Sequence, residues 1–324
     1  MTTKALFFAG CAVVLLAVAG CGRKDAPAVA PAMPAPAAAA GQGRNTAAPV
    51  DGPATLAAPA AAGAGAVIDV RWTGPGNTGD YIDLVPRGDT ATSGEITYAY
   101  TRDAMPAAKL TLPTTPGDYD IRYVLDTGSA RTIKATAPIA VTAVAATLTG
   151  PPAVEGAEPI EVAWSGPSGD QDYIDIVPSS VTEPSGEITY AWARDGSPAK
   201  LTAPGKAGDH LVRYVQEGPT GRKILSISPL RVTQPAATID GPDIAAAGAA
   251  FNVEWSGPKR RGDYVDLVKK GQVETSGELS YFYTAGSSNS QLKAPAEAGQ
   301  YDIRYVLEAP GGRVVLARRT ISVR

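Results

Sequence analysis

The sequence predicts an all-β protein built from three tandem copies of one small domain. Three tryptophans, Trp72, Trp164 and Trp255, recur about 90 residues apart, each within a Trp-x-Gly-Pro motif. Apolar and polar residues alternate along short segments such as 68–72, which is the pattern of half-buried strands. Gly-Pro, Gly-Asp and Ser-Gly pairs punctuate these segments, and the sequence has no convincing helical period.

Each copy carries the same motifs in the same order. In the first copy they are Trp-Thr-Gly-Pro at 72–75, Gly-Asp-Tyr at 79–81, Ser-Gly-Glu at 93–95 and Ile-Arg-Tyr-Val at 121–124. The three copies span 66–143, 144–235 and 236–324. A period of this length corresponds to one domain per copy, not to a solenoid turn. We expect seven strands in each copy; in the second they lie near 146–149, 160–164, 172–177, 187–194, 199–203, 210–217 and 222–232.

Seven antiparallel strands in a domain of this size suit two packed sheets, and each copy resembles an immunoglobulin-like β-sandwich. The segment 117–119 resembles the tyrosine corner of that architecture, although the paired cysteines of true immunoglobulin domains are missing. The motifs at 72–75, 79–81, 100–103 and 121–124 also resemble accessory repeats that stand beside von Willebrand factor A domains in bacterial envelope proteins. The Asp-x-Ser-x-Ser metal motif of the A domain itself is not in the sequence.

Residues 1–20 read as an export signal, with Lys4 before an apolar run from 5 to 18. The run ends in Leu-Ala-Val-Ala-Gly before Cys21, which resembles the lipobox of bacterial lipoproteins and implies acylation of Cys21 by fatty acids such as palmitate. The alternative is an ordinary signal peptidase site, because Ala-Val-Ala at 17–19 also fits. By resemblance to enterobacterial lipoproteins, Gly22 favours the outer membrane. The expected location is therefore the cell envelope, with a lipid anchor in the membrane.

Residues 21–65 consist largely of Ala, Pro and Gly. This composition cannot bury a core, so we expect a disordered, semi-extended tether. About 45 residues at ~3.1 Å each would reach on the order of 140 Å from the membrane.

Charge gives only one hint about a partner. The chain has 29 Lys and Arg against 32 Asp and Glu, so no general attraction to nucleic acid is expected. The basic residues of the third copy form a candidate binding loop: Lys259, Arg260, Arg261, Lys269 and Lys270. We expect an anionic contact there, either an acidic protein face or a charged envelope polymer, and the alternative is a solvated surface loop.

The sequence contains no recognisable catalytic set, and it predicts neither an enzyme nor a cofactor site. Cys11 would leave with the signal, and acylation would consume Cys21. The one histidine, His210, aligns with Tyr119 and Tyr301, which indicates a structural corner position. Residues 197–200 match Ser-x-x-Lys, but Pro198 disfavours the helix that this motif requires.

Acidic residues recur in every copy, and Asp170, Asp172 and Asp175 come nearest to a calcium-binding density. Cross-strand ion pairs explain the repetition better, so no metal site is predicted. The expected pairs face outward on neighbouring strands and are Asp83 with Arg122, Asp175 with Arg213 and Asp266 with Arg304.

Each copy also carries a row of aromatic residues at period two, namely Tyr98 with Tyr100, Tyr190 with Trp192, and Tyr281 with Tyr283. An aliphatic neighbour in each row favours the sandwich interior, and the alternative is an exposed platform for carbohydrate. The function that follows is a binding or scaffolding protein of the envelope that acts through loops or sheet edges. The alternative is a glycan- or peptidoglycan-binding protein, and an envelope enzyme ranks third.

Overall fold

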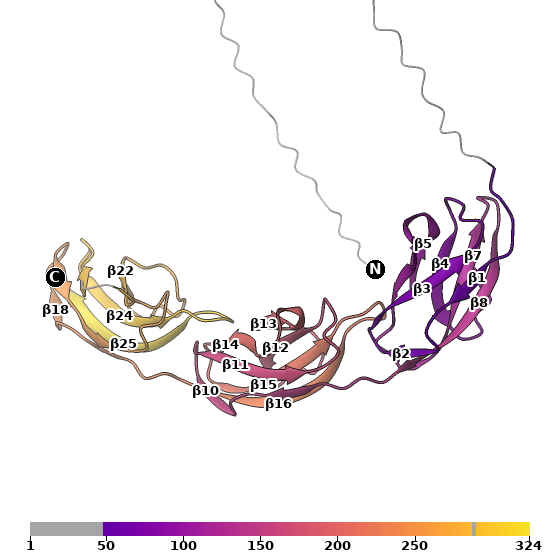
Figure 1. Ribbon diagram of the computed structural model, residues 1–324. Helices are drawn as coiled ribbons and strands as arrows, with labels where there is room; N and C mark the ends of the chain where they lie inside the picture. Colours follow the sequence, from indigo (N-terminus) through magenta and orange to yellow (C-terminus); the bar gives the residue numbers. More distant parts are fainter. Residues whose placement is uncertain (1–47, 287–289) are drawn as a thin grey trace, which may run out of the picture. The chain divides into compact units, whose positions relative to one another are not determined.

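The computed structural model describes residues 48–286 and 290–324, which form three tandem immunoglobulin-like β-sandwich modules (Figure 1). The first module contains β1 (Thr55–Ala57), β2 (Ala61–Gly63), β3 (Val67–Thr73), β4 (Tyr81–Pro86), β5 (Thr97–Tyr100), β6 (Ala108–Thr111), β7 (Gly117–Asp126) and β8 (Arg131–Thr142). The second contains β9 (Thr147–Thr149), β10 (Ala153–Glu155), β11 (Pro159–Ser165), β12 (Tyr173–Pro178), β13 (Thr189–Trp192), β14 (Ala199–Thr202), β15 (Gly208–Gln216) and β16 (Lys223–Thr233).

The third module repeats this order with one strand interrupted. It contains β17 (Thr238–Asp240), β18 (Ile244–Ala245), β19 (Ala250–Asn252), β20 (Glu254–Ser256), β21 (Tyr264–Lys269), β22 (Ser280–Tyr283), β23 (Gln291–Lys293), β24 (Gly299–Leu307) and β25 (Val314–Val323). The helical turns η1 (Thr101–Asp103) and η2 (Ala193–Asp195) follow β5 and β13. Within the described ranges, none of the helical segments is long and apolar enough to cross a bilayer.

Each module has a five-stranded sheet, packed against a three-stranded sheet in the first two modules and against two short pairs, β17-β20 and β19-β23, in the third. In the first module the orders are β2-β8-β7-β4-β5 and β1-β3-β6, and the second module repeats both orders. The pairing is antiparallel except for one parallel pair in each module, namely β2 with β8, β10 with β16 and β18 with β25. Alternate residues from both sheets meet in the core, with Ile68 and Val70 from β3 packing in one cluster with Ile82 and Leu84 from β4. The apolar residues that alternate along the sequence are therefore those that face the core between the two sheets, as expected.

The Trp-x-Gly-Pro motif closes one end of this core. Trp72 packs on Tyr123 with ring centroids 5.8 Å apart, and the corresponding pairs in the other modules are 5.5 and 5.8 Å apart. A Cβ on Gly74 would come within 2.7 Å of the Tyr123 ring. Only glycine fits this position, which accounts for its repetition after each tryptophan.

A buried ion pair lies on the opposite face of the five-stranded sheet, away from the core. Asp83 and Arg122 stand directly across from each other on β4 and β7, with Nε–Oδ1 and Nη2–Oδ2 distances of 3.0 and 2.6 Å. Arg122 also donates to the backbone carbonyls of Asp89 and Ala91 in the segment that joins β4 to β5. That segment covers the pair, so the expected pairing is confirmed but the expected exposure is wrong: the two side chains are 0% and 1% exposed.

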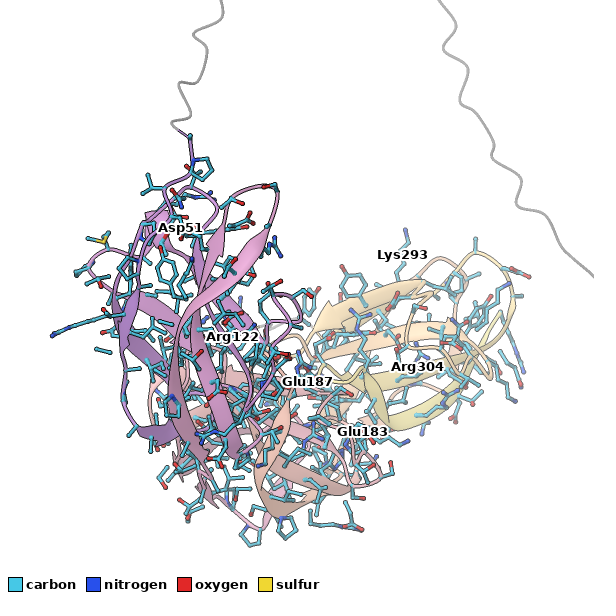
Figure 2. The ribbon with its side chains drawn as sticks, turned by 90° about the vertical axis from the view of Figure 1, so that its right-hand side faces the viewer. Asp51, Arg122, Glu183, Glu187, Lys293 and Arg304 are labelled. Carbon is cyan, nitrogen blue, oxygen red and sulfur yellow. The ribbon has the colours of Figure 1, made fainter. Side chains whose placement is uncertain are left out.

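The other modules repeat this ion pair. Arg213 with Asp175 and Arg304 with Asp266 have the same pair of distances, 3.0 and 2.6 Å, and each arginine donates to carbonyls of the covering segment. Figure 2 labels Arg122 and Arg304 on the first and third modules. Burial raises the pKa of each aspartate, and the guanidinium opposes that rise through two hydrogen bonds.

The first module begins earlier than the sequence indicates. Residues 55–57 and 61–63, assigned above to the tether 21–65, form β1 and β2 and pair with β3 and β8. These strands are rich in Ala and Gly, and their partners supply most of the apolar surface, so composition does not reveal them. The expected signal peptide, Cys21 and the expected tether up to residue 47 lie outside the described residues, so these stay predictions.

Removing one partner of a buried ion pair should destabilise its module far more than removing one partner of an exposed ion pair. We expect Asp175→Ala to lower the free energy of unfolding of the second module by about 3–5 kcal/mol, because it leaves the Arg213 guanidinium buried without its counter-ion. Asp209→Ala is the matched control, because the Asp209–Arg231 pair has side chains 69% and 59% exposed and should contribute about 0–1 kcal/mol. Native-state amide hydrogen exchange of β12 and β15 measures both, and equal losses would contradict the prediction.

Candidate functional site

Three aromatic rings lie in a row on the outer face of the five-stranded sheet of each module. In the first module, Tyr81 comes from β4 and both Tyr98 and Tyr100 come from β5, with Tyr81 directly opposite Tyr100. The ring centroids are 5.4–6.5 Å apart, and the planes meet at 69–83°, which are edge-to-face contacts. The corresponding rings are Tyr173, Tyr190 and Trp192 in the second module and Tyr264, Tyr281 and Tyr283 in the third. We call each row an aromatic site.

The assignment of these rows to the sandwich interior is wrong. The middle tyrosines, Tyr98, Tyr190 and Tyr281, are 53%, 50% and 55% exposed. Register explains the error: Tyr98 pairs with Asp83 on the outer face, while Ala99 pairs with Ile82 and packs on the core. The half-exposed ring recurs in all three copies beside two further aromatic rings, which makes each row a candidate interaction surface.

Charged side chains frame each aromatic site. In the first module the Arg131 guanidinium lies 5.5 Å from the centroid of the Tyr81 ring and pairs with Asp126 at 3.0 Å. The second module has Arg222 over Tyr173, paired with Glu217 and Glu187. The third has Arg313 over Tyr264, paired with Glu308 and Glu278. Each site thus combines exposed rings with a guanidinium and carboxylates.

The same hollow occurs at this place in two modules. In the first it measures about 400 Å³ and in the third about 300 Å³. The residues that line it in the third module are Gly262, Tyr264, Glu278, Tyr281, Tyr283, Glu308 and Arg313. Each of them aligns with a lining residue of the first module, so the hollow belongs to the repeat and not to one irregular loop.

The inner tyrosine of each site serves as a hydrogen-bond donor. Burial, followed by the nearby charge of Glu95, raises the pKa of Tyr81 to about 12, and the hydroxyl donates to the carbonyl of Thr92 at 3.0 Å. Burial and a hydrogen bond to Glu278 raise the pKa of Tyr264 as well. These phenols stay neutral at physiological pH and hold the segment that covers the ion pair.

The predicted basic loop does not form one cluster. Lys259, Arg260 and Arg261 precede β21, whereas Lys269 and Lys270 stand at and just after its end. A six-residue strand separates the two groups by roughly 20 Å. Lys259 places its ammonium 5.1 Å from the centroid of the Trp255 ring, and Lys269 pairs with Glu297 at 3.9 Å. A binding role for these residues stays a prediction.

His210 occupies the corner position expected from the sequence. It is 6% exposed, and its Nδ1 lies 3.2 Å from the carbonyl oxygen of Gly208. At the same position, Tyr119 donates its hydroxyl to the carbonyl of Thr115 at 2.9 Å, which is a tyrosine corner.

The residues of the Ser-x-x-Lys match, like His210, occupy structural positions. Ser197 accepts a hydrogen bond at 3.0 Å from the backbone N–H of Trp164, and Lys200 lies exposed on strand β14. The side chains are therefore not presented on one helical turn, as the catalytic motif requires.

The acidic cluster of the second module is divided among different partners. Asp172 accepts from the Tyr214 hydroxyl at 2.9 Å, and Asp175 is held by Arg213. Residues 48–286 and 290–324 contain no group of three or more side chains arranged to hold a metal ion.

No protein-family model matches the chain, and no curated protein sequence matches it. Among solved structures it is similar to Sidekick-1 immunoglobulin domains 1-5, at 15% identity and a TM-score of 0.23 over 86% of this chain and 60% of that one. It is also similar to Drosophila OTK extracellular domains 3-5, at 10% identity and a TM-score of 0.22 over 81% and 92% of the two chains. Scores this low say nothing about function, and the resemblance to accessory repeats stays a prediction.

Removing a ring of the aromatic site should leave the stability of the fold nearly unchanged. We expect Tyr190→Ser to change the free energy of unfolding of the second module by less than about 1 kcal/mol, because the ring is half exposed on the outer face. By contrast, Tyr214→Phe removes the hydroxyl that donates to buried Asp172 and should cost about 1–2 kcal/mol. Native-state hydrogen exchange of β12 and β15 measures both, and a larger loss for Tyr190→Ser would assign that ring to the core.

Proposed function

We propose that this chain is a non-catalytic, lipid-anchored binding or scaffolding protein of the bacterial cell envelope. One observation carries the proposal: each of the three modules repeats the same exposed aromatic site with its guanidinium and carboxylates. Tyrosine, tryptophan and arginine are the residues that dominate binding energy at protein interfaces. Their repetition on a rigid sheet supports recognition of a protein partner.

Three sites on one chain support multivalent binding. When one site engages a partner, the others meet their targets at a raised effective concentration, so avidity exceeds the affinity of a single site. The proposed anchor at Cys21 and the tether behind it would hold this array at the membrane surface, and stable anchoring requires more than one acyl chain.

Glycan binding is the second candidate function. Exposed rings beside carboxylates and a guanidinium are the feature that a carbohydrate site needs, and the aromatic site supplies them. A glycan array probed with the mature chain separates this candidate from a protein partner.

Removing the middle ring from every site should abolish binding to the envelope. We expect the triple variant Tyr98→Ser, Tyr190→Ser and Tyr281→Ser to lose more than about 100-fold in apparent affinity for envelope fractions, because avidity is lost together with the contacts. Ile227→Ser is the matched control, since Ile227 is 54% exposed on β16 away from the site. A pull-down with the mature chain carrying Cys21→Ser measures both, and equal retention of triple variant and control would refute the site.

Lipidation at Cys21 has a separate test. We expect Cys21→Ser to remove incorporation of radioactive fatty acid and to leave the exported protein soluble or unprocessed, because serine offers no thiol for acylation. Sucrose-gradient fractionation of the unmodified protein should place it with outer-membrane markers. Equal incorporation into both proteins would contradict a lipid anchor, and co-sedimentation with the inner membrane would contradict the location.

A further inference from the structure

The aromatic site of the third module lacks a cation that the other two modules supply themselves. In the first module the Arg102 guanidinium lies 4.2 Å from the centroid of the Tyr100 ring, and in the second Arg194 lies 4.7 Å from that of Trp192. The sequences around them are Tyr-Thr-Arg-Asp at 100–103 and Trp-Ala-Arg-Asp at 192–195, whereas the third module reads Tyr-Thr-Ala-Gly at 283–286. Ala285 therefore stands where the stacking arginine would be.

The missing arginine leaves the outer ring open. Tyr283 is 54% exposed, whereas Tyr100 and Trp192 are only partly exposed. Among the residues that the structure describes, no cation stacks on Tyr283. The basic residues nearest to Tyr283 in the sequence, Lys270 and Lys293, neither line the hollow nor stack on a ring.

The charge of the third site differs as well. In the first module Arg102 pairs with Asp103 at 3.3 Å and Arg131 pairs with Asp126 at 3.0 Å. The third module has Ala285 and Gly286 in place of Arg102 and Asp103, so both members of the outer ion pair are missing. Its hollow is lined by two carboxylates, Glu278 and Glu308, and by one guanidinium, Arg313, and this negative lining attracts a cationic ligand.

The angle between the rings favours a planar cation over a neutral sugar as the ligand. The planes of Tyr281 and Tyr283 meet at 81°, so the two rings do not form one flat platform for a sugar. A single planar guanidinium can stack on Tyr283 alone and still direct its N–H groups to a carboxylate. Arg102 shows this in the first module, where it stacks on Tyr100 and donates to the carboxylate of Asp103 at 3.3 Å and to the carbonyl of Thr78 at 2.8 Å.

We propose that the aromatic site of the third module binds an arginine side chain of a partner protein, in the place that Arg102 and Arg194 occupy within their own modules. The inference rests on the proposed function and adds the class of ligand group that is recognised. The first two modules carry their own arginine over the outer ring, whereas none of the described residues of the third module places a cation over Tyr283, so a partner's side chain can take that place.

The test uses a short arginine peptide and its neutral counterpart. The mature chain carrying Cys21→Ser, with ring-labelled tyrosine, is titrated by NMR with acetyl-Gly-Arg-Gly-amide and with the same peptide containing citrulline. We expect the arginine peptide, at millimolar concentration, to shift the ring signals of Tyr281 and Tyr283. The citrulline peptide should bind about fivefold or more weakly, because it keeps the shape of arginine but loses the charge that attracts it to the ring.

Two reciprocal variants supply the control. Ala285→Arg installs the internal arginine and should abolish the shifts, whereas Arg102→Ala opens Tyr100 and should create a second responding site in the first module. Because the second variant gains a signal, loss of folding cannot imitate it. Equal binding of both peptides, no effect of Ala285→Arg, or a response only to a chitin oligosaccharide would each overturn the inference.

The two experiments distinguish failure of this inference from failure of the proposed function. If the triple tyrosine variant loses envelope binding but the arginine peptide causes no shifts, only the class of ligand is wrong. If the peptide binds as expected while the triple variant retains envelope binding, the third site recognises arginine but does not carry the proposed function.

Discussion

The buried pair of Asp83 and Arg122 is the interaction on which the outer face of the first module depends. Its guanidinium is satisfied by the carboxylate and by two backbone carbonyls, which fixes the segment between β4 and β5 against the sheet. Desolvating two charges is costly, so this pair stabilises the module only while both partners and the carbonyls remain in place. The same segment carries Glu95 and accepts the hydroxyl of Tyr81 at Thr92, so the aromatic site is held by the ion pair beside it.

Core and site use aromatic residues in different ways. Trp72 and Tyr123 pack between the sheets, where Gly74 leaves room for the ring, and the Tyr123 hydroxyl donates to buried Asp80. Tyr98 and Tyr100 stand edge to face on the outer side of the five-stranded sheet, where Tyr98 is half exposed and Tyr100 is partly covered by Arg102. Because a strand directs alternate side chains to opposite faces, one sheet can supply the packing and the binding surface without conflict.

The three copies differ at the rim of the site. The rings, the inner arginine and the carboxylates recur in each module, whereas the outer arginine is present in two and replaced by Ala285 in the third. Replacing the exposed pair Arg102 and Asp103 by Ala285 and Gly286 costs the fold little, yet it removes the stacked guanidinium and opens the face of one ring. Repetition followed by such local change would let one scaffold present related sites of different specificity.

The sequence by itself determined the three copies, nearly all of the strands and the identity of the Asp–Arg partners, because these follow from period-two alternation and from motifs repeated at a constant spacing. Tertiary structure decided which face each aromatic row occupies. Alternation defines two faces but not which one is buried, and the register of β5 on β4 placed Tyr98 beside Asp83 instead of Ile82. It also decided that the ion pair is covered and that Ala- and Gly-rich residues 55–63 join the sandwich, since both depend on segments that meet only in the fold.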